Sequence, residues 1–140
     1  MDKHTPVNPV CSFYEHENQI HEVVFHVATP QAVDQWFEYV EQTNKSYQAP
    51  DVVFYIMDTS RSGDLPVRYT RERAERYEKE NPNRPFARMV GLHNDATSGL
   101  MLNVLNLFVR WLQRNPKAKI RFFPVSKRDE AIQWLLSNKD

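Results

Sequence analysis

Histidine and glutamate side chains, which can bind a metal ion, are concentrated near the start of the chain. The residues are Glu15, His16, Glu17, His21, Glu22 and His26. The three histidines recur every five positions, and a five-residue step along a strand reverses the face. His21 is therefore expected to point away from His16 and His26. A hairpin could reunite some of these side chains, but partly exposed hairpin histidines are the simpler interpretation, and we expect no metal site.

Motifs for nucleophilic catalysis or phosphate binding are absent from the sequence. The chain holds no Gly-x-Ser-x-Gly elbow, no Gly-x-Gly-x-x-Gly and no Gly-Lys-Ser/Thr loop, and it has three glycines in all. Cys11 falls near the start of an edge-type strand, with no neighbour that would lower the pKa of its thiol. We therefore expect a protein that is not an enzyme and needs no cofactor. A hydrolase that uses His93 and Asp95 is an alternative.

Two polar loops follow expected parallel strands, and either could bind a ligand. Their residues are Asp58, Thr59, Ser60, Arg61 and Ser62 in the first loop and His93, Asn94 and Asp95 in the second. Ligands of open α/β sheets bind beyond the carboxyl ends of strands. Each loop also leads toward a helix N-terminus, where free N–H groups favour an anion or a phosphoryl group. The alternative is that these side chains only cap helices and close turns.

Hydrophobic periodicity divides the chain into the elements that must position these loops. Apolar runs predict strands at residues 10–16, 20–28, 51–57, 86–91 and 119–123. Helical spacing predicts helices that start at Thr29-Pro30, Leu65, Gly99 and Ser126, where Ser126 and Asp129 resemble a capping box. The order ββαβαβαβα predicts an α/β fold with a mixed, mainly parallel sheet, an N-terminal antiparallel hairpin and four helices.

Length and composition limit the class of protein. The chain has 140 residues, so residues 1–140 fit one domain, with residues 1–8 as a loose N-terminal segment. Eighteen Lys and Arg balance eighteen Asp and Glu, which argues against the basic surface of a nucleic-acid-binding protein. The apolar run at residues 100–112 is too short for a transmembrane segment. One cysteine and an opening without an apolar signal sequence favour a cytoplasmic protein.

The helix expected at residues 99–114 has an unusually wide apolar surface. Its polar side chains occupy an arc of about 100° and its apolar side chains an arc of about 220°. A helix on a sheet needs an apolar stripe little wider than about 100°. Six residues form the two surplus flanks: Leu100, Leu102, Leu105, Leu107, Val109 and Trp111. Neighbouring helices, an apolar ligand or a second copy of the chain could cover them, and we expect a homodimer.

Three segments of the chain resemble motifs of one known family. The strand Val52-Val-Phe-Tyr-Ile-Met-Asp58 ends in an aspartate and hydroxyl loop, and Arg84-Pro-Phe-Ala-Arg-Met-Val-Gly91 resembles the family's next strand. Arg121-Phe-Phe-Pro124 before Lys127-Arg-Asp-Glu-Ala-Ile-Gln-Trp-Leu135 is similar to its closing strand and Glu-Ala-x-x-Trp-Leu helix. The family is that of the SpoIIAA-like, or STAS-like, domains. The resemblance implies a βα superhelix shared with anti-anti-sigma factors and, more distantly, with CRAL-TRIO lipid-binding domains.

The resemblance also implies a function. It predicts a regulatory or protein-interaction domain with an unidentified protein partner, in which Ser60 is nearest to the residue that anti-anti-sigma domains phosphorylate. Arg61 stands where those domains have glycine, and Ser62-Gly63 is displaced by two positions. A phosphate on Ser60 is expected to lie near a helix N-terminus and beside Arg61. The likeness to CRAL-TRIO domains implies the alternative, a protein that binds a small lipid or other apolar ligand.

Replacement of Trp111 by Glu is expected to convert the homodimer into a monomer, because a charge would enter the apolar contact between two copies. Light scattering measures the mass, and circular dichroism verifies that the fold is retained. Val109→Glu is expected to act in the same way. A wild-type monomer at concentrations on the order of tens of micromolar would contradict the expected dimer.

Overall fold

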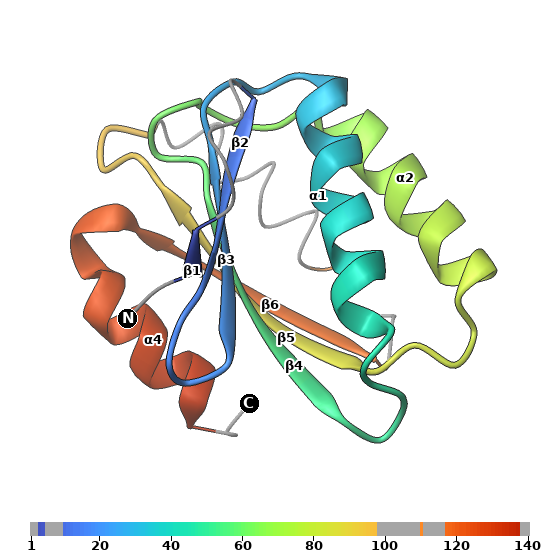
Figure 1. The fold of residues 1–140 in the computed structure, drawn as a ribbon. Helices are drawn as coiled ribbons and strands as arrows, with labels where there is room; N and C mark the ends of the chain where they lie inside the picture. The colour runs from blue at the N-terminus through green and yellow to red at the C-terminus, as the bar shows by residue number, and fades with distance from the viewer. Residues whose placement is uncertain (1–2, 5–9, 98–109, 111–116, 138–140) are drawn as a thin grey trace.

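The computed structural model describes residues 3–4, 10–97, 110 and 117–137 of the chain (Figure 1). Its elements are β1 (Lys3–His4), β2 (Cys11–Glu15), β3 (Ile20–Phe25), α1 (Pro30–Asn44), β4 (Val52–Asp58), α2 (Val67–Glu80), β5 (Phe86–His93), β6 (Ala118–Pro124), the 3₁₀ helix η1 (Val125–Lys127) and α4 (Arg128–Leu136). The α/β class is confirmed. The helix expected at residues 99–114, the third of the four predicted helices, lies outside the described residues except for Arg110.

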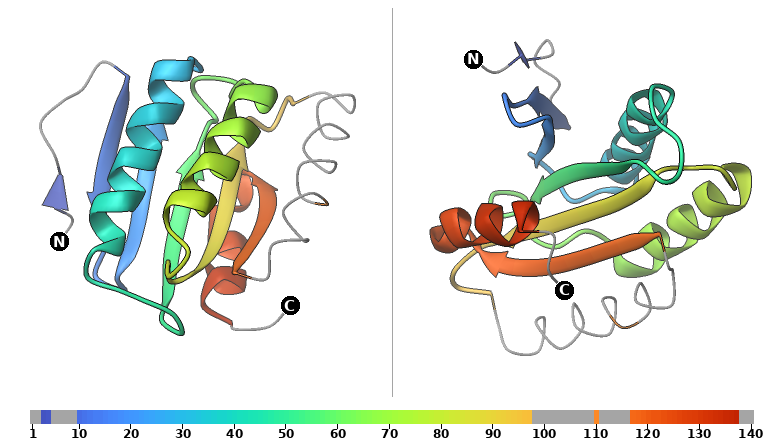
Figure 2. Two further views of the ribbon diagram at one scale, coloured as in Figure 1. Left: turned by 90° about the vertical axis from the view of Figure 1, so that its right-hand side faces the viewer. Right: turned by 90° about the horizontal axis from the view of Figure 1, so that it is seen from below.

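A six-stranded sheet forms the middle layer, and its strands lie side by side in chain order from β1 to β6. Figure 2 shows this order in its left view as a run of colour from blue to orange. β1, β2 and β3 pair antiparallel, which confirms the expected hairpin, and the later strands pair parallel. The sequence predicts a loose segment at residues 1–8, whereas Lys3 and His4 form β1, because the open edge of β2 offers unpaired backbone groups.

Helices cover both faces of the sheet. Figure 1 shows α1 and α2 on one side, here called the α1–α2 face, and α4 on the other, here called the α4 face. Helix α1 begins as predicted, because the Thr29 hydroxyl accepts a hydrogen bond from the Ala32 N–H at 3.3 Å and Pro30 occupies the first turn. The predicted apolar stripe of α1 is buried: Ala32, Val33, Trp36, Phe37 and Val40.

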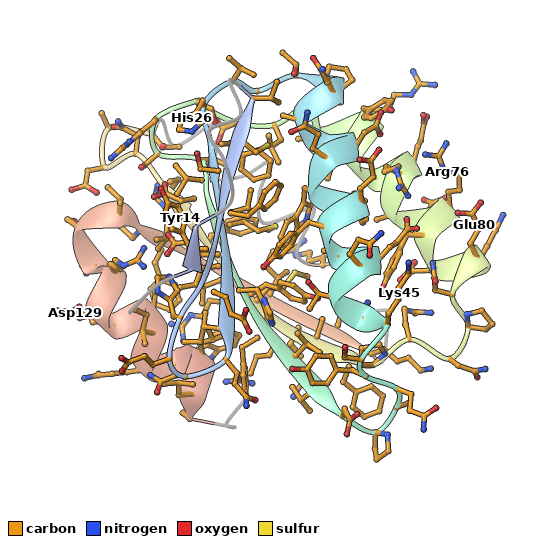
Figure 3. The ribbon with its side chains drawn as sticks, viewed as in Figure 1. Tyr14, His26, Lys45, Arg76, Glu80 and Asp129 are labelled. Carbon is orange, nitrogen blue, oxygen red and sulfur yellow. The ribbon has the colours of Figure 1, made fainter. Side chains whose placement is uncertain are left out.

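A buried arginine connects the two helices of the α1–α2 face. Arg73 on α2 donates to the Glu41 carboxylate on α1 at 3.0 Å, and its guanidinium lies 5.0 Å from the centre of the Phe37 ring. On the outer side of α2, the expected pair Arg68 and Glu72 is exposed. Figure 3 shows Arg76 and Glu80 pointing away from the sheet. One side of α2 is thus solvated, while Arg73 fixes its position against α1.

A second apolar core lies on the α4 face. It contains Ile20, Ile56, Val90, Leu92, Phe123, Ala131 and Leu135. Arg88 of β5, 5% exposed, stands among these residues. Its guanidinium donates to the carbonyl of Leu135 at 3.0 Å and to that of Trp134 at 2.8 Å, and it lies 3.9 Å from the centre of the Trp134 ring. The positive charge therefore meets the negative end of the α4 dipole.

Gly91 allows β5 and β6 to pack closely. It is paired with Phe122 across the two strands. A Cβ atom at position 91 would lie 2.4 Å from two carbon atoms of the Phe122 ring. Because no real contact is that short, the Phe122 ring occupies the space that any other residue at position 91 would need.

Arg88→Met is expected to lower the free energy of unfolding by about 2 kcal/mol, because the buried carbonyls of Trp134 and Leu135 lose their donor. Urea denaturation followed by tryptophan fluorescence measures the change. Arg68→Met is the matched control, since the Arg68 side chain is 94% exposed, and it should change the free energy by less than about 0.5 kcal/mol. Equal losses in the two variants would contradict the role assigned to Arg88.

Candidate functional site

The two loops singled out by the sequence meet at the carboxyl edge of the sheet. We call residues 58–62 the β4 loop and residues 93–95 the β5 loop. The Thr59 N–H and hydroxyl both donate to the carbonyl of Leu92, at 2.9 and 3.1 Å. The Asn94 amide donates to the carbonyl of Ser60 at 3.4 Å. The two loops form one connected surface, because β4 and β5 are parallel neighbours that end side by side.

The β4 loop closes on the carboxylate of Asp58, which is 9% exposed. One oxygen of Asp58 accepts from the Ser60 N–H at 2.9 Å and from the Ser60 hydroxyl at 2.6 Å. The Gly63 N–H donates to the Thr59 carbonyl at 3.0 Å, and Gly63 has φ of 81°, a value that glycine adopts without strain. The Ser60 hydroxyl is thus half-buried and held by a carboxylate at the start of a closed turn.

No side chain of the β4 loop caps α2. That helix starts at Val67 with Pro66 at its N-cap and no side-chain cap. Ser62 donates to the carbonyl of Gly63 at 2.8 Å, and Arg61 is exposed. The interpretation of these residues as turn formers is confirmed. The expectation that they cap the following helix is wrong, because α2 has no side-chain cap.

The β5 loop is held by its own backbone and by η1. His93, 6% exposed, is hydrogen-bonded through Nδ1 to the carbonyl of Asn94 at 2.9 Å. The Asn94 side chain accepts from the Ala96 N–H at 2.7 Å. Asp95 accepts from the Ser126 N–H at 3.1 Å, and hydrogen bonds from Ser126 lower the pKa of Asp95. His93 and Asp95 are therefore each engaged with a different partner.

The expected capping box at Ser126 is wrong. The α-helix starts at Arg128, its N-cap Lys127 makes no side-chain cap, and the turn before it is 3₁₀. Asp95, from the β5 loop, supplies the carboxylate that receives the Ser126 N–H. A contact between distant segments thus replaces the local contact that the sequence suggests.

Sequence reasoning missed a buried ion pair on the α4 face. Glu22 on β3 is 4% exposed and accepts from two guanidinium nitrogens of Arg128, at 2.7 and 2.8 Å. His16 Nε2 lies 2.7 Å from the same carboxylate. Hydrogen bonds to Glu22 raise the pKa of Arg128, and the charge of Asp58 adds to this effect. Arg128 therefore connects β3 with the start of α4.

The pKa of Glu22 reflects two opposing causes. Burial raises it, but the hydrogen bonds and charge of Arg128 and His16 outweigh burial and hold the pKa of Glu22 below its ordinary value of 4.5. Glu22 is the only acidic residue of β3. An acidic residue within a buried strand indicates that the fold must supply a cationic partner. The sequence around Glu22 does not indicate which residue this is, because Arg128 lies 106 positions away.

The three histidines at positions 16, 21 and 26 have separate hydrogen-bond partners. His21 faces the α1–α2 face, where Nδ1 lies 2.9 Å from the Tyr39 hydroxyl and burial lowers the pKa of the ring. His26 Nε2 lies 2.8 Å from the Ser12 hydroxyl. Across residues 10–97 and 117–137, no group of three His, Cys, Asp or Glu side chains could hold a metal ion.

Cys11 is inaccessible. It is 0% exposed, and its thiol donates to the carbonyl of Ala32 at 3.7 Å. Burial raises the pKa of Cys11 to about 12. β1 pairs only with the Tyr14 and Glu15 end of β2. Cys11 is instead covered by the core that contains Ala32 and Val33, so the thiol is protected from solvent and remains protonated.

An apolar cavity of about 130 Å³ lies on the α1–α2 face. Side chains from α1, α2, β4, β5 and β6 line it, among them Met57, Ala74 and Met89. The expected apolar flanks of the helix at residues 99–114 lie outside the described residues: Leu100, Leu102, Leu105, Leu107, Val109 and Trp111. In the part of the chain that is described, no helix is long and apolar enough to cross a membrane.

Comparisons with known proteins gave no relative. No protein-family model, no curated protein and no solved structure matches this chain.

Glu22→Gln tests the buried ion pair through pH. The pKa of Glu22 is lower in the folded than in the unfolded state, so its stabilisation is present above about pH 4.5 and is lost as the pH falls below that value. We expect the variant to be less stable than the wild type by about 2 kcal/mol at neutral pH. This difference should shrink as acid protonates Glu22 in the wild type.

Urea denaturation across this pH range measures the difference. Glu72→Gln is the control, since Glu72 is 61% exposed and pairs with an exposed arginine, and its effect should stay within about 0.5 kcal/mol at every pH. A Glu22→Gln difference that does not change with pH would refute the ion pair as the source of acid sensitivity.

Proposed function

We propose that this chain is a cytoplasmic, non-enzymatic regulatory domain that binds a protein partner in the manner of STAS-like domains. One observation carries the proposal: the β4 and β5 loops are joined into a single hydrogen-bonded surface at the carboxyl edge of the sheet. Arg61, Asn94 and Asp95 are exposed on it. Since the loops are already ordered by their own contacts, a partner that binds them does not bear the entropy of ordering them.

The shape of this surface supports a protein partner rather than a small substrate. Among the described strands the order never reverses, so no crevice opens between diverging crossovers at the carboxyl edge. His93 and Asp58 are nearly covered, and each is engaged in hydrogen bonds within its loop. What remains accessible is a set of short polar side chains and one arginine, the residue of this set that is enriched at protein interfaces.

Ser60 is the residue at which modification would regulate binding. Its hydroxyl donates to Asp58, and a phosphate would turn this donor into an acceptor with a charge of about −1.5 to −2. Repulsion from the buried Asp58 carboxylate would then open the turn. The expected effect is a change in the shape of the β4 loop, not stabilisation by a helix N-terminus, because α2 begins only at Val67.

A second candidate function, the binding of a small lipid or other apolar ligand, is favoured by the cavity on the α1–α2 face. Cavities lined mainly by apolar side chains are the usual sites for such ligands. The homodimer expected from residues 99–114 also belongs to this proposal, as an assembly that light scattering tests.

Charge reversal at Arg61 tests the proposed partner surface. Arg61→Glu is expected to reduce capture of a specific protein partner at least about tenfold, because it reverses the only charge of that sign on the loop surface. Arg76→Glu is the matched control, since Arg76 is also exposed but lies on the outer side of α2. Affinity capture with the full chain as bait, read by quantitative mass spectrometry, compares the two variants with the wild type.

Ser60→Asp extends the same experiment. It is expected to change the amount of protein partner captured, because the added charge opens the turn of the β4 loop.

Partners retained by Arg61→Glu but lost with Arg76→Glu would assign binding to α2 instead. Turnover of a substrate that disappears on replacement of Asp58, His93 or Asp95 would overturn the non-enzymatic assignment.

A further inference from the structure

The cavity on the α1–α2 face runs along β5 beneath α2. Small residues make room for it on the sheet, at Ala87 and Ala118, and on the helix, at Ala74. Met57 and Met89 contribute flexible apolar side chains to its walls. All the residues used in this argument belong to the described part of the chain.

Charged groups are placed unequally at the two ends of the cavity. Arg84 and Lys117 line the end where β5 and β6 begin, together with Glu78, so this end carries two cations and one carboxylate. Asp64 lines the other end, beside Thr59. An anionic group is therefore attracted to the end with Arg84 and Lys117 and repelled from the end with Asp64.

The cationic end is partly shielded from solvent. The Arg84 side chain is 14% exposed and its guanidinium lies 3.5 Å from the Glu78 carboxylate. Arg84 also donates to the carbonyl of Asn81 at 3.2 Å, and Lys117 donates to that of Pro82 at 2.8 Å. These contacts hold Arg84 and Lys117 at the mouth of the cavity. The low exposure of Arg84 strengthens its attraction for an anion, whereas Lys117 is half-buried.

We propose that the cavity binds a small apolar carboxylate, with its hydrocarbon portion between α2 and β5 and its carboxylate beside Arg84 and Lys117. A dry apolar cavity of about 150 Å³ holds a ligand the size of benzene, so a hydrocarbon portion of about six carbon atoms matches the volume of about 130 Å³, with the carboxylate outside it at the mouth. The inference rests on the second candidate function, ligand binding, and adds to it the charge, size and orientation of the ligand.

Three probes with one tail and different head groups test the proposal: octanoate, octan-1-ol and octylamine. The full-length protein carries ¹³C-methyl methionine, so that the methyl signals of Met57 and Met89 report occupation of the cavity directly. Octanoate is expected to shift both signals and to bind about tenfold more tightly than octan-1-ol. Octylamine is expected to bind more weakly than either.

Lys117→Gln removes one cation of the mouth and is expected to weaken octanoate about tenfold while leaving octan-1-ol unchanged. Lys119→Gln is the matched control, because Lys119 is an exposed lysine on β6 that does not line the cavity. Ala74→Leu fills the cavity and should weaken both probes together. Circular dichroism verifies the fold of each variant.

The outcomes separate the two levels of the proposal. Equal binding of octanoate and octan-1-ol, unaffected by Lys117→Gln, would overturn the carboxylate inference and leave apolar-ligand binding standing. Absence of shifts at Met57 and Met89 with all three probes would overturn both. Octanoate shifts that occur only at other methionines would locate binding elsewhere and would also overturn the inference.

Discussion

Buried charge holds α4 on the sheet, and the loop surface at the carboxyl edge depends on it. Arg128 at the first residue of α4 meets Glu22 of β3, and Arg88 of β5 meets the carbonyls at the other end of the helix. A buried ion without partners costs several kcal/mol, so each contact admits few positions of the helix. Apolar packing alone would tolerate sliding and rotation of α4, whereas the two charged contacts determine both.

Hydrogen bonds link the start of α4 to the β5 loop and, through it, to the β4 loop. Ser126, just before α4, donates to Asp95 of the β5 loop, and the β5 loop is bonded to the β4 loop through Asn94 and Ser60. The carboxyl edge is thus one connected unit that spans β3, β4, β5 and α4, although its members come from segments far apart in the chain.

The sequence predicts the elements of this fold better than the contacts between them. The strand expected at residues 20–28 follows from local periodicity and is present from Ile20 to Phe25. The helix that starts at Thr29-Pro30 follows from a local cap and is also present. The Glu22–Arg128 pair could not be derived, because any cationic residue of the chain could have met Glu22. The prediction of a cap at Ser126 was wrong for the same reason. Asp95, which accepts the Ser126 N–H, lies 31 positions away in the sequence and is brought to Ser126 only by the fold. The turn at Asp58 and Ser60 is local, and its residue types do indicate it.

Gly91 has a consequence for how the chain finds its register. The Phe122 ring fits over β5 only where a side chain is missing, and the neighbours of Gly91 on the same face of the strand are Met89 and His93, which both carry large side chains. A shift of β6 by one residue would move each of its side chains to the opposite face of the sheet, which is unfavourable. A shift by two residues would keep every side chain on its own face and would not have this cost. It would, however, drive the ring into one of those side chains. Only position 91 leaves space for the Phe122 ring, so the missing side chain fixes the register of β5 and β6 during folding.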